Sequence, residues 1–380
     1  MAYGDIGAVI DEITFDGGTC GFTKILHVIN DIYVIAHRGT GDDGYVHTVS
    51  ISDVGDIGGA VIDSLEFDTV QSYYPDMIRI SANVFAVCYM GPEWDGWLCT
   101  FSVSDAGDIG GAVIDSWEFD DTKGGYPRFI HISGNIWAIA YDDGVNDGQV
   151  FTVSIADNGT ITKSKIDILK FDAAKGDHPA IIHIADAVYA ISYVGPDNDG
   201  WLCTFTISDA GVISNSVIDT LEFEGDTAYN SKIIHVVDDI YAIAYNGPGA
   251  TGWLCTVSIS GVGNIGAAVI DSWEFDGSVA YFPEIIFISG NIYAIAYKGV
   301  DADGWILTIT ISTIGTIGAD AIDRFEFNET GGCFPSLIHI ADNIYAMSYE
   351  SFGSIGKVLT LDISTKPIGF VKHLPFMGVG

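Results

Sequence analysis

The sequence predicts an all-β chain in which seven similar four-stranded antiparallel sheets form one closed ring. Three observations predict it: a 52-residue repeat, four short apolar segments in each repeat, and turn residues between those segments. Seven equal units occupy residues 1–380, which we expect to be a single domain. The repeat is marked by an Ile-Asp pair that returns without insertion at Ile10-Asp11, Ile62-Asp63, Ile114-Asp115, Ile166-Asp167, Ile218-Asp219, Ile270-Asp271 and Ile322-Asp323.

Each repeat has four segments with the β-branched and aromatic composition of strands. Residues 78–80, 241–245, 97–104 and 113–119 are examples of the first to the fourth segment. Glycine, asparagine and aspartate between the segments accept the positive φ of hairpin turns, so we expect consecutive hairpins. Examples of these turns are Gly134-Asn135 after a first strand, Asp95-Gly96 after a second strand and Asp105-x-Gly107 after a third strand.

The first two strands of each repeat are apolar almost throughout instead of alternating, which predicts sheets that are covered on both faces. Stacking like sheets around an axis provides that cover. The chain resembles β-propeller repeat proteins over nearly its whole length, with a WD40-like strand layout and seven blades. The turn at Asp105 and Gly107 is similar to part of the sialidase Asp-box, but the rest of that motif is absent. A β-solenoid is the alternative fold.

The two ends of the sequence offer competing strands for closing the ring. Residues 9–16 form a fourth-strand copy that precedes the first complete repeat, so this strand is placed to complete the last blade. Residues 370–376 form a weaker copy, in which Pro375 disfavours a fully paired strand. We therefore expect the N-terminal strand to close the ring.

The charge of the chain excludes some classes of partner. Fifteen Lys and Arg residues against 51 Asp and Glu residues give a net charge of −36, which repels nucleic acid and anionic membranes. No apolar run is long enough for membrane insertion, and no secretory signal opens the sequence. We expect a monomer located outside the cell or at its surface.

The resemblance implies that the loops after the second and fourth strands of each repeat share one face of the ring. One loop position on this face should surround the mouth of the central channel. His178 beside Asp177 is the singular polar pair there and a candidate general base. The candidate ligand-binding residues at this position are Tyr74, Tyr126, His178, Phe282 and Phe334, joined by Phe22 and Asn230.

Two further features occur on the same expected face. Trp97, Trp201, Trp253 and Trp305 begin third strands, and they either stack on sugar rings or fill space between blades. The Asp-x-Asp-Gly loops provide Asp197 with Asp199 and Asp301 with Asp303 as candidate Ca²⁺ ligands, with simple turn formation as the alternative. Apart from this Ca²⁺ site, we expect no cofactor.

A ring of imidazoles occurs in the first strands. It could bind a metal or sense pH, but Phe287 at the same position favours a structural, hydrogen-bonded role. Its members are His27, His131, His183, His235 and His339.

The uniform repeats favour a non-catalytic binding or scaffolding protein that recognises a glycan or a protein through one loop face. The alternatives are an enzyme with its active site at the mouth of the central channel, and a structural module of a larger surface protein. An enzyme would require polar residues that occur in only one or two blades.

Overall fold

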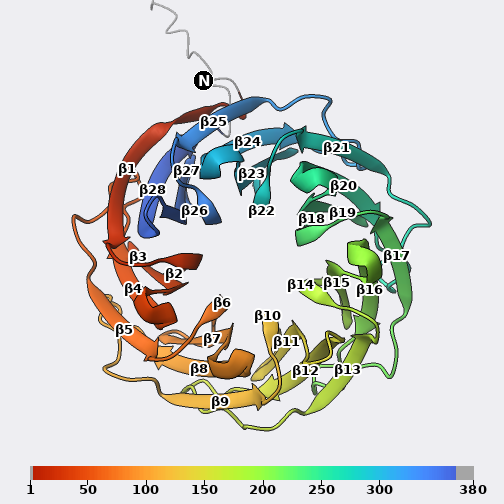
Figure 1. Cartoon of the computed structure of the whole chain (residues 1–380), viewed down its shortest axis with the longest axis horizontal. Coiled ribbons are helices and arrows are strands. Elements are labelled where there is room, and N and C mark those ends of the chain that lie inside the picture. Colours follow the sequence, from red (N-terminus) through yellow and green to blue (C-terminus); the bar gives the residue numbers. More distant parts are fainter. Residues whose placement is uncertain (1–2, 365–380) are drawn as a thin grey trace, which may run out of the picture.

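The computed structural model describes residues 3–364. Over this range the strands form seven four-stranded antiparallel sheets, arranged as the blades of a ring (Figure 1). This confirms the predicted seven-bladed β-propeller. None of the described helices is long and apolar enough to cross a membrane.

In each blade the first strand lies next to the central channel and the fourth strand lies on the rim (Figure 1). Blade 1 comprises β2 (Gly21–Ile29), β3 (Ile32–Arg38), β4 (Gly44–Ser50) and β5 (Asp63–Asp68); blade 2 comprises β6 (Tyr73–Arg79), β7 (Val84–Met90), β8 (Gly96–Ser102) and β9 (Asp115–Asp120). Blade 3 comprises β10 (Gly125–Ser133), β11 (Ile136–Asp142), β12 (Gly148–Ser154) and β13 (Asp167–Asp172); blade 4 comprises β14 (Asp177–Ala185), β15 (Val188–Val194), β16 (Gly200–Thr206) and β17 (Asp219–Glu224).

The remaining blades follow the same order. Blade 5 comprises β18 (Tyr229–Val237), β19 (Ile240–Asn246), β20 (Gly252–Ser258) and β21 (Asp271–Asp276). Blade 6 comprises β22 (Tyr281–Ser289), β23 (Ile292–Lys298), β24 (Gly304–Thr310) and β25 (Asp323–Asn328). Blade 7 comprises β26 (Cys333–Ala341), β27 (Ile344–Ser351), β28 (Ile355–Ile363) and, on its rim, β1 (Ile6–Asp16).

The N-terminal strand β1 is longer than the expected segment 9–16. It pairs antiparallel with β28 from Ile6↔Ile363 to Asp16↔Gly356, so residues from the two ends of the described chain share one sheet. The competing copy at 370–376 lies outside the described residues.

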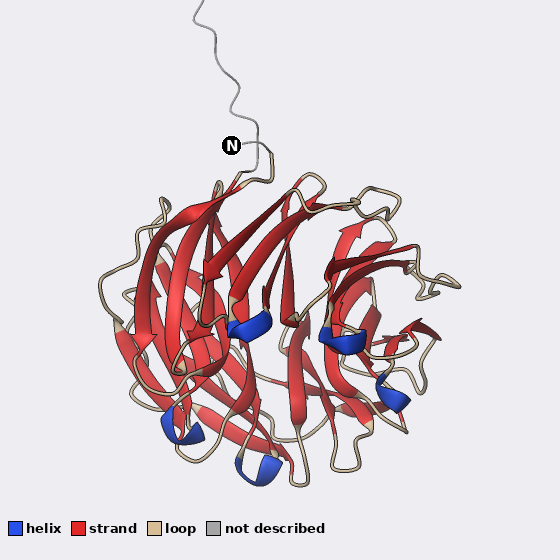
Figure 2. Ribbon diagram, turned by 45° about the horizontal axis from the view of Figure 1, so that its top comes forward, coloured by secondary structure: helices blue, strands red, loops and turns tan. Residues whose placement is uncertain are grey.

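Five short 3-10 helices occupy the loops after the second strands, where tight turns were expected (Figure 2). A residue with positive φ lies at the centre of each, so these loops are wider than a two-residue turn. The helices are η1 (Thr40–Asp42), η2 (Pro92–Trp94), η3 (Pro196–Asn198), η4 (Pro248–Ala250) and η5 (Val300–Ala302).

The hydrophobic core lies between blades rather than within one of them. One cluster, for example, combines Val34 and Val46 of blade 1 with Phe85, Val87 and Phe101 of blade 2, all fully buried. The second strand of each blade is buried along most of its length, as its apolar sequence predicts. The innermost strands differ, because one position near the beginning of each is charged in five of the seven blades, and these charged side chains line the channel.

The constant residues of the repeat form a latch between neighbouring blades. The aspartate of each Ile-Asp pair accepts a hydrogen bond from a backbone N–H of the next blade, as Asp167 does from Ile213 at 2.9 Å. A buried threonine of the third strand donates to a glycine carbonyl in the same turn, as Thr152 does to Gly211 at 2.6 Å. Gly211 has a φ of 81°, which a residue with a Cβ adopts only with strain.

Both hydrogen bonds of the latch recur at all seven blade junctions, including the closing one. The aspartate bonds join Asp11–Ile57, Asp63–Ile109, Asp115–Ile161, Asp167–Ile213, Asp219–Ile265, Asp271–Ile317 and Asp323–Ile6. The threonine bonds join Thr48–Gly107, Thr100–Gly159, Thr152–Gly211, Thr204–Gly263, Thr256–Gly315, Thr308–Gly4 and Thr360–Gly55.

We expect Asp167→Ala to lower the free energy of unfolding by about 1–3 kcal/mol, because the buried N–H of Ile213 would lose its acceptor. Urea denaturation measures this. The control is Asp209→Ala, an exposed carboxylate in the same turn as Ile213, which should change the value by less than about 0.5 kcal/mol. Equal losses in the two variants would contradict a role of the latch in stability.

Candidate functional site

Each innermost strand begins with a β-bulge at the mouth of the channel. In blade 2, Tyr73 pairs with Met90 and Asp76 pairs with Cys88, so Tyr74 and Pro75 together oppose one residue of β7. A bulge re-aims a side chain, and bulges are common beside active sites. The seven bulge residues are Phe22, Tyr74, Tyr126, His178, Asn230, Phe282 and Phe334, and their φ angles lie between 49 and 55°.

Six of the bulge residues form an aromatic collar around the mouth. The ring centroids of consecutive members lie 3.5–4.2 Å apart, in the order Phe282, Phe334, Phe22, Tyr74, Tyr126 and His178. Asn230 interrupts the collar between His178 and Phe282, and its amide donates to Oδ1 of Asn246 at 2.9 Å. The mouth is therefore apolar around most of its circumference and polar at one place.

The loops of this face hold the collar in position. The backbone N–H of Ser72, before β6, donates to the carbonyl of Asp42 in the preceding blade's loop at 2.7 Å. Gly124 and Trp94 make the same contact at 2.9 Å one blade further on. The loops after second and fourth strands therefore lie together on one face, as the resemblance implied.

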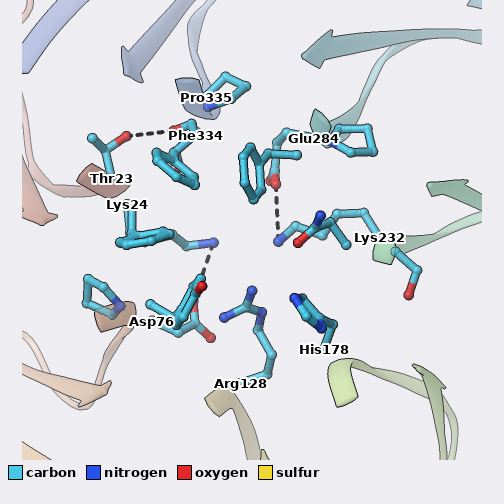
Figure 3. A pocket seen from close by; sticks show the side chains of 17 residues that line it. Thr23, Lys24, Asp76, Arg128, His178, Lys232, Glu284, Phe334 and Pro335 are labelled. Carbon is cyan, nitrogen blue, oxygen red and sulfur yellow. Dashed lines mark hydrogen bonds and ion pairs between the residues drawn. The ribbon is translucent and has the colours of Figure 1, made fainter. Parts of the chain in front are cut away.

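Charged side chains line the channel just inside the collar, two residues after the bulge residues (Figure 3). Nζ of Lys24 lies 3.6 Å from Asp76, and Nζ of Lys232 lies 3.1 Å from Glu284. Arg128 points into the same space, whose cavity volume is about 100 Å³, enough for several water molecules. The pocket thus gathers three cations and two carboxylates.

The cations dominate the electrostatics of this channel pocket. Burial by itself would raise the pKa of Asp76, but Lys24, Arg128 and Lys232 together lower it below its ordinary value of 3.8. The backbone N–H of Phe129 also donates to Asp76, at 2.9 Å. The carboxylate of Asp76 is therefore ionised, and its oxygens already have partners in Lys24 and in the N–H of Phe129. The pocket carries a formal charge of +1 in a chain whose net charge is −36.

The side chain of His178 lines this pocket. Its ring stacks on Tyr126 with centroids 3.5 Å apart, and its Nδ1 atom is buried without a hydrogen-bond partner in the described structure. Burial, together with the Arg128, Lys175 and Lys123 cations, lowers its pKa to about 3 against the opposing effect of Asp177. The imidazole is therefore neutral near pH 7.

The predicted mouth residues come together, and the predicted tryptophans lie elsewhere. Tyr74, His178, Phe282 and Phe334 line the channel pocket, and Tyr126 contacts two of them. The four tryptophans are half-buried on third strands, where each packs against a hydrophobic cluster between blades. They are Trp97, Trp201, Trp253 and Trp305, and none of them lines the channel pocket.

The Asp-x-Asp-Gly loops place their carboxylates at the ends and centres of 3-10 helices. Asp197 and Asp301 are exposed at the positive-φ centres of η3 and η5. Asp199 and Asp303 follow these helices, and one oxygen of each is buried without a partner among residues 3–364. No third carboxylate or imidazole of the described chain clusters with either pair. A Ca²⁺ site there stays a prediction.

The five histidines of the first strands are exposed, and they lie at the ends of those strands that are farther from the mouth. Nε2 of His183 lies 2.8 Å from the carbonyl of Asp186, three residues further on, and the other four members make the same contact. These histidines are hydrogen-bonded to the turns of their own hairpins rather than placed between blades, so they do not gather at one site.

Sequence reasoning missed the channel charges. The innermost strands were expected to be apolar, and this expectation left out five charged residues: Lys24, Asp76, Arg128, Lys232 and Glu284. These strands begin earlier than expected, so the charged residues belong to them. The available signal was one repeat position that reads Lys, Asp, Arg, Ala, Lys, Glu and Ser in the seven blades.

Comparisons with known proteins show the fold but no family. No protein-family model and no curated protein matches the chain. Its fold is similar to Pseudomonas aeruginosa periplasmic gluconolactonase, PpgL, with a TM-score of 0.58 and 13% identity over 80% of this chain and 83% of that one. It is also similar to a Bacteroides uniformis protein provisionally assigned as a 6-phosphogluconolactonase (TM-score 0.57, 10% identity, 86% and 94% covered). The fold is also similar to that of BBS1N in complex with ARL6DN, with a TM-score of 0.57 and 6% identity over 96% of this chain and 98% of that one.

The prediction of a non-catalytic binding or scaffolding propeller is wrong, because these structural neighbours include propeller enzymes. The prediction relied on the uniformity of the repeats. That uniformity ends at the channel, where Arg128 and His178 are each unique among the seven blades at their positions.

We expect acid to destabilise the protein through His178. The unfolded chain protonates this residue near its ordinary pKa of 6.5, whereas the folded chain does so only near 3. Stability that His178 provides at neutral pH is therefore lost as pH falls through this window, by about 1.4 kcal/mol per pH unit. Urea denaturation between pH 7 and pH 4 measures the free energy of unfolding of the wild type and of His178→Asn. As pH falls, the wild type should lose more of this free energy than the variant does. A constant difference would contradict burial of a neutral imidazole; His183→Asn, on the same strand but exposed, is the control.

Proposed function

We propose that this protein is an enzyme that hydrolyses a small cyclic ester of a sugar acid at the mouth of the central channel. The proposal is supported by the channel pocket and by the two lactonase-named neighbours of the same fold. The single observation that carries it is the convergence of Lys24, Arg128 and Lys232, three of only 15 cations in the chain, beside the neutral imidazole of His178.

Lactone hydrolysis develops negative charge on the carbonyl oxygen. Preorganised cations stabilise such an oxyanion most effectively in a site that excludes bulk water. Arg128 points toward the centre of the pocket beside His178, and its guanidinium has no carboxylate at ion-pair distance in the described chain (Figure 3). Arg128 is therefore our candidate for binding the oxyanion, with Lys24 and Lys232 reinforcing the field.

His178 is our candidate proton acceptor. A water molecule gives one proton to the imidazole of His178 while its oxygen bonds to the carbonyl carbon. The ring C–O bond of the resulting intermediate then breaks, and the proton on His178 passes to the leaving alcohol oxygen. The product is a hydroxy acid, which ionises to a carboxylate. An anionic group beside Arg128 would raise the pKa of His178 and so strengthen it as a base during the reaction.

The collar suits the remainder of a sugar acid. Its aromatic rings offer flat apolar surfaces to the C–H groups of a sugar, and Asn230 offers polar atoms to hydroxyl groups at one place. The periplasmic location of the Pseudomonas neighbour supports our expectation that this protein works outside the cytoplasm.

The test is hydrolysis of D-glucono-1,5-lactone, followed by the proton release that accompanies product ionisation. We expect the wild type to exceed the spontaneous rate. Arg128→Met should lower kcat about 10²–10³-fold by removing an oxyanion donor, and His178→Asn should lower it about 10²–10⁴-fold by removing the base.

His183→Asn provides the matched control, because this exposed imidazole lies on the same strand, β14, and outside the pocket. Its rate should equal that of the wild type. The proposal fails if no lactone or ester of a sugar acid is hydrolysed faster than in buffer, or if Arg128→Met and His178→Asn retain full activity while correctly folded.

A further inference from the structure

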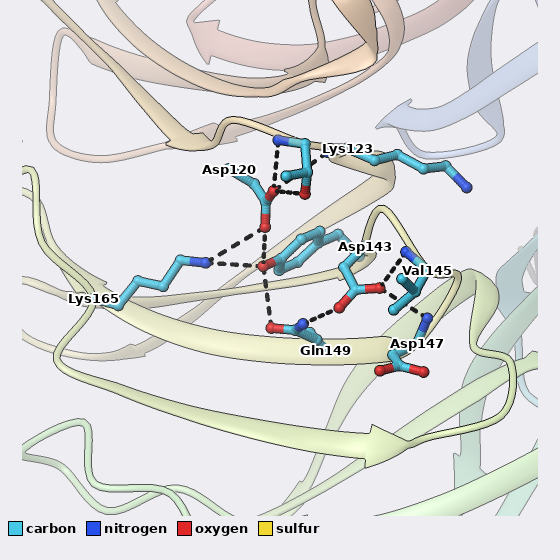
Figure 4. A network of polar contacts seen from close by, with 9 residues as sticks. Asp120, Lys123, Asp143, Val145, Asp147, Gln149 and Lys165 are labelled. Carbon is cyan, nitrogen blue, oxygen red and sulfur yellow. Dashed lines mark hydrogen bonds and ion pairs between the residues drawn. The ribbon is translucent and has the colours of Figure 1, made fainter.

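A tyrosine–acid pair recurs between neighbouring blades. In blade 3 the hydroxyl of Tyr141, on the second strand, donates to Oδ2 of Asp120, on the rim strand of blade 2, at 2.8 Å (Figure 4). The same pair occurs as Tyr89–Asp68, Tyr193–Asp172, Tyr245–Glu224 and Tyr297–Asp276, at 2.8–3.0 Å. Blade 7 keeps the tyrosine as Tyr349.

Blade 1 departs from this pattern at two positions at once. His37 stands where the other six blades have tyrosine, and it faces Asp16, the last residue of the closing strand β1. His47, on the adjacent strand β4, stands where the other blades have only Cys, Phe or Leu, as at Cys99, Phe151, Cys203, Cys255, Leu307 and Leu359. A buried apolar position has thus become an imidazole beside another imidazole.

The three side chains meet in one small space. One ligand atom from each of Asp16, His37 and His47 lies within 4.8 Å of the other two, and Nε2 of His37 is 3.6 Å from Oδ2 of Asp16. The two imidazole rings stack with centroids 5.0 Å apart. Adjacent ligands of a tetrahedral Zn²⁺ are roughly 3.4 Å apart, so small side-chain movements would complete the geometry.

The hydrogen bonds of the two imidazoles leave their facing nitrogens free. Nδ1 of His37 lies 2.9 Å from the carbonyl of Arg38, and Nδ1 of His47 lies 2.8 Å from the hydroxyl of Ser64. A carbonyl can only accept, so Nδ1 of His37 carries the proton and Nε2 carries the lone pair. Both Nε2 atoms are buried without a hydrogen-bond partner in residues 3–364. Water cannot easily replace the missing partners, because the His37 residue is 0% exposed and the His47 residue 8% exposed.

We propose that Asp16, His37 and His47 form a binding site for one divalent transition-metal ion of the Zn²⁺ class, at the seam where the ring closes. Two imidazoles and one carboxylate are a common ligand set for such ions, and partners on the other ring nitrogens are typical of metal-bound histidine. A hard ion such as Ca²⁺ would prefer oxygen ligands only. Two buried nitrogens without partners are otherwise unfavourable.

The site would also link two blades. Asp16 belongs to the rim strand of blade 7, whereas His37 and His47 lie on β3 and β4 of blade 1. A bound ion would therefore fasten the N-terminal strand to blade 1, in addition to the latch bonds at this junction. Because binding would require the folded ring, the ion should stabilise the protein against unfolding.

The experiment uses the full chain without a polyhistidine tag, stripped with a chelator and titrated calorimetrically with ZnCl₂. We expect one equivalent of Zn²⁺ to bind and the melting temperature to rise with Zn²⁺ concentration. Co²⁺ in place of Zn²⁺ should give visible absorption bands of a four- or five-coordinate site. Ser64→Ala should weaken binding about 10–100-fold by freeing the His47 ring.

The decisive variant is His37→Tyr/His47→Leu, which places at both positions residues that other blades carry, neither of them an imidazole or a thiol, and should therefore fold. It should bind no stoichiometric Zn²⁺, gain no thermal stability from it and lose the Co²⁺ bands. His131→Asn, an exposed imidazole of the first-strand ring, should bind as the wild type does. Zn²⁺ binding that persists in the double variant, or no binding by the wild type, would overturn the proposal.

Discussion

The bond between neighbouring blades is the interaction on which the rest of the structure depends. A single four-stranded blade exposes two apolar faces, and it can bury them only against the next blade. The latch sets the register of that contact, because an aspartate and a threonine of one blade both bind the turn of the next. Each partner is buried or half-buried, so a misplaced blade would leave polar backbone groups without hydrogen bonds. The latch therefore explains why the Ile-Asp pair and the glycine of the turn that it binds recur at every junction.

A scaffold held together in this way leaves the channel free to vary. The charged channel-lining residues of its innermost strands lie outside the hydrophobic clusters between blades, so they can differ from blade to blade without changing the apolar core. Lys24, Asp76 and Arg128 occupy equivalent positions in three successive blades and differ in both charge and size. Convergence of such residues with His178 produces an asymmetric pocket from nearly symmetric parts. This asymmetry is what a chemical step requires, since acid–base groups and oxyanion donors must differ from one another.

The junction between blades 7 and 1 combines the constant latch with residues that depart from the repeat. It retains the latch, through Asp11 and Thr360, and it alone replaces the tyrosine of the tyrosine–acid pair by histidine. Here the last blade joins a strand from the opposite end of the chain, so no covalent connection along the sequence holds that strand to its sheet. A metal ion at Asp16 would join this strand to blade 1, in addition to the loop that already connects them.

The sequence by itself determined the ring, its seven blades and the order of the strands, because a fixed 52-residue period and turn residues at fixed offsets are local and repeated. It also located the mouth residues from Phe22 to Phe334, since they share one position in every repeat. The tertiary structure decided which residues meet. Lys24, Arg128 and Lys232 are separated by about two repeats or more and converge only because the ring places equivalent positions around one axis. The tryptophans were ambiguous for the same reason, since burial between blades depends on packing that periodicity does not encode. Asp16, His37 and His47 lie on three different strands of two blades, and only the packing of one blade's rim strand against the next blade brings the first beside the other two.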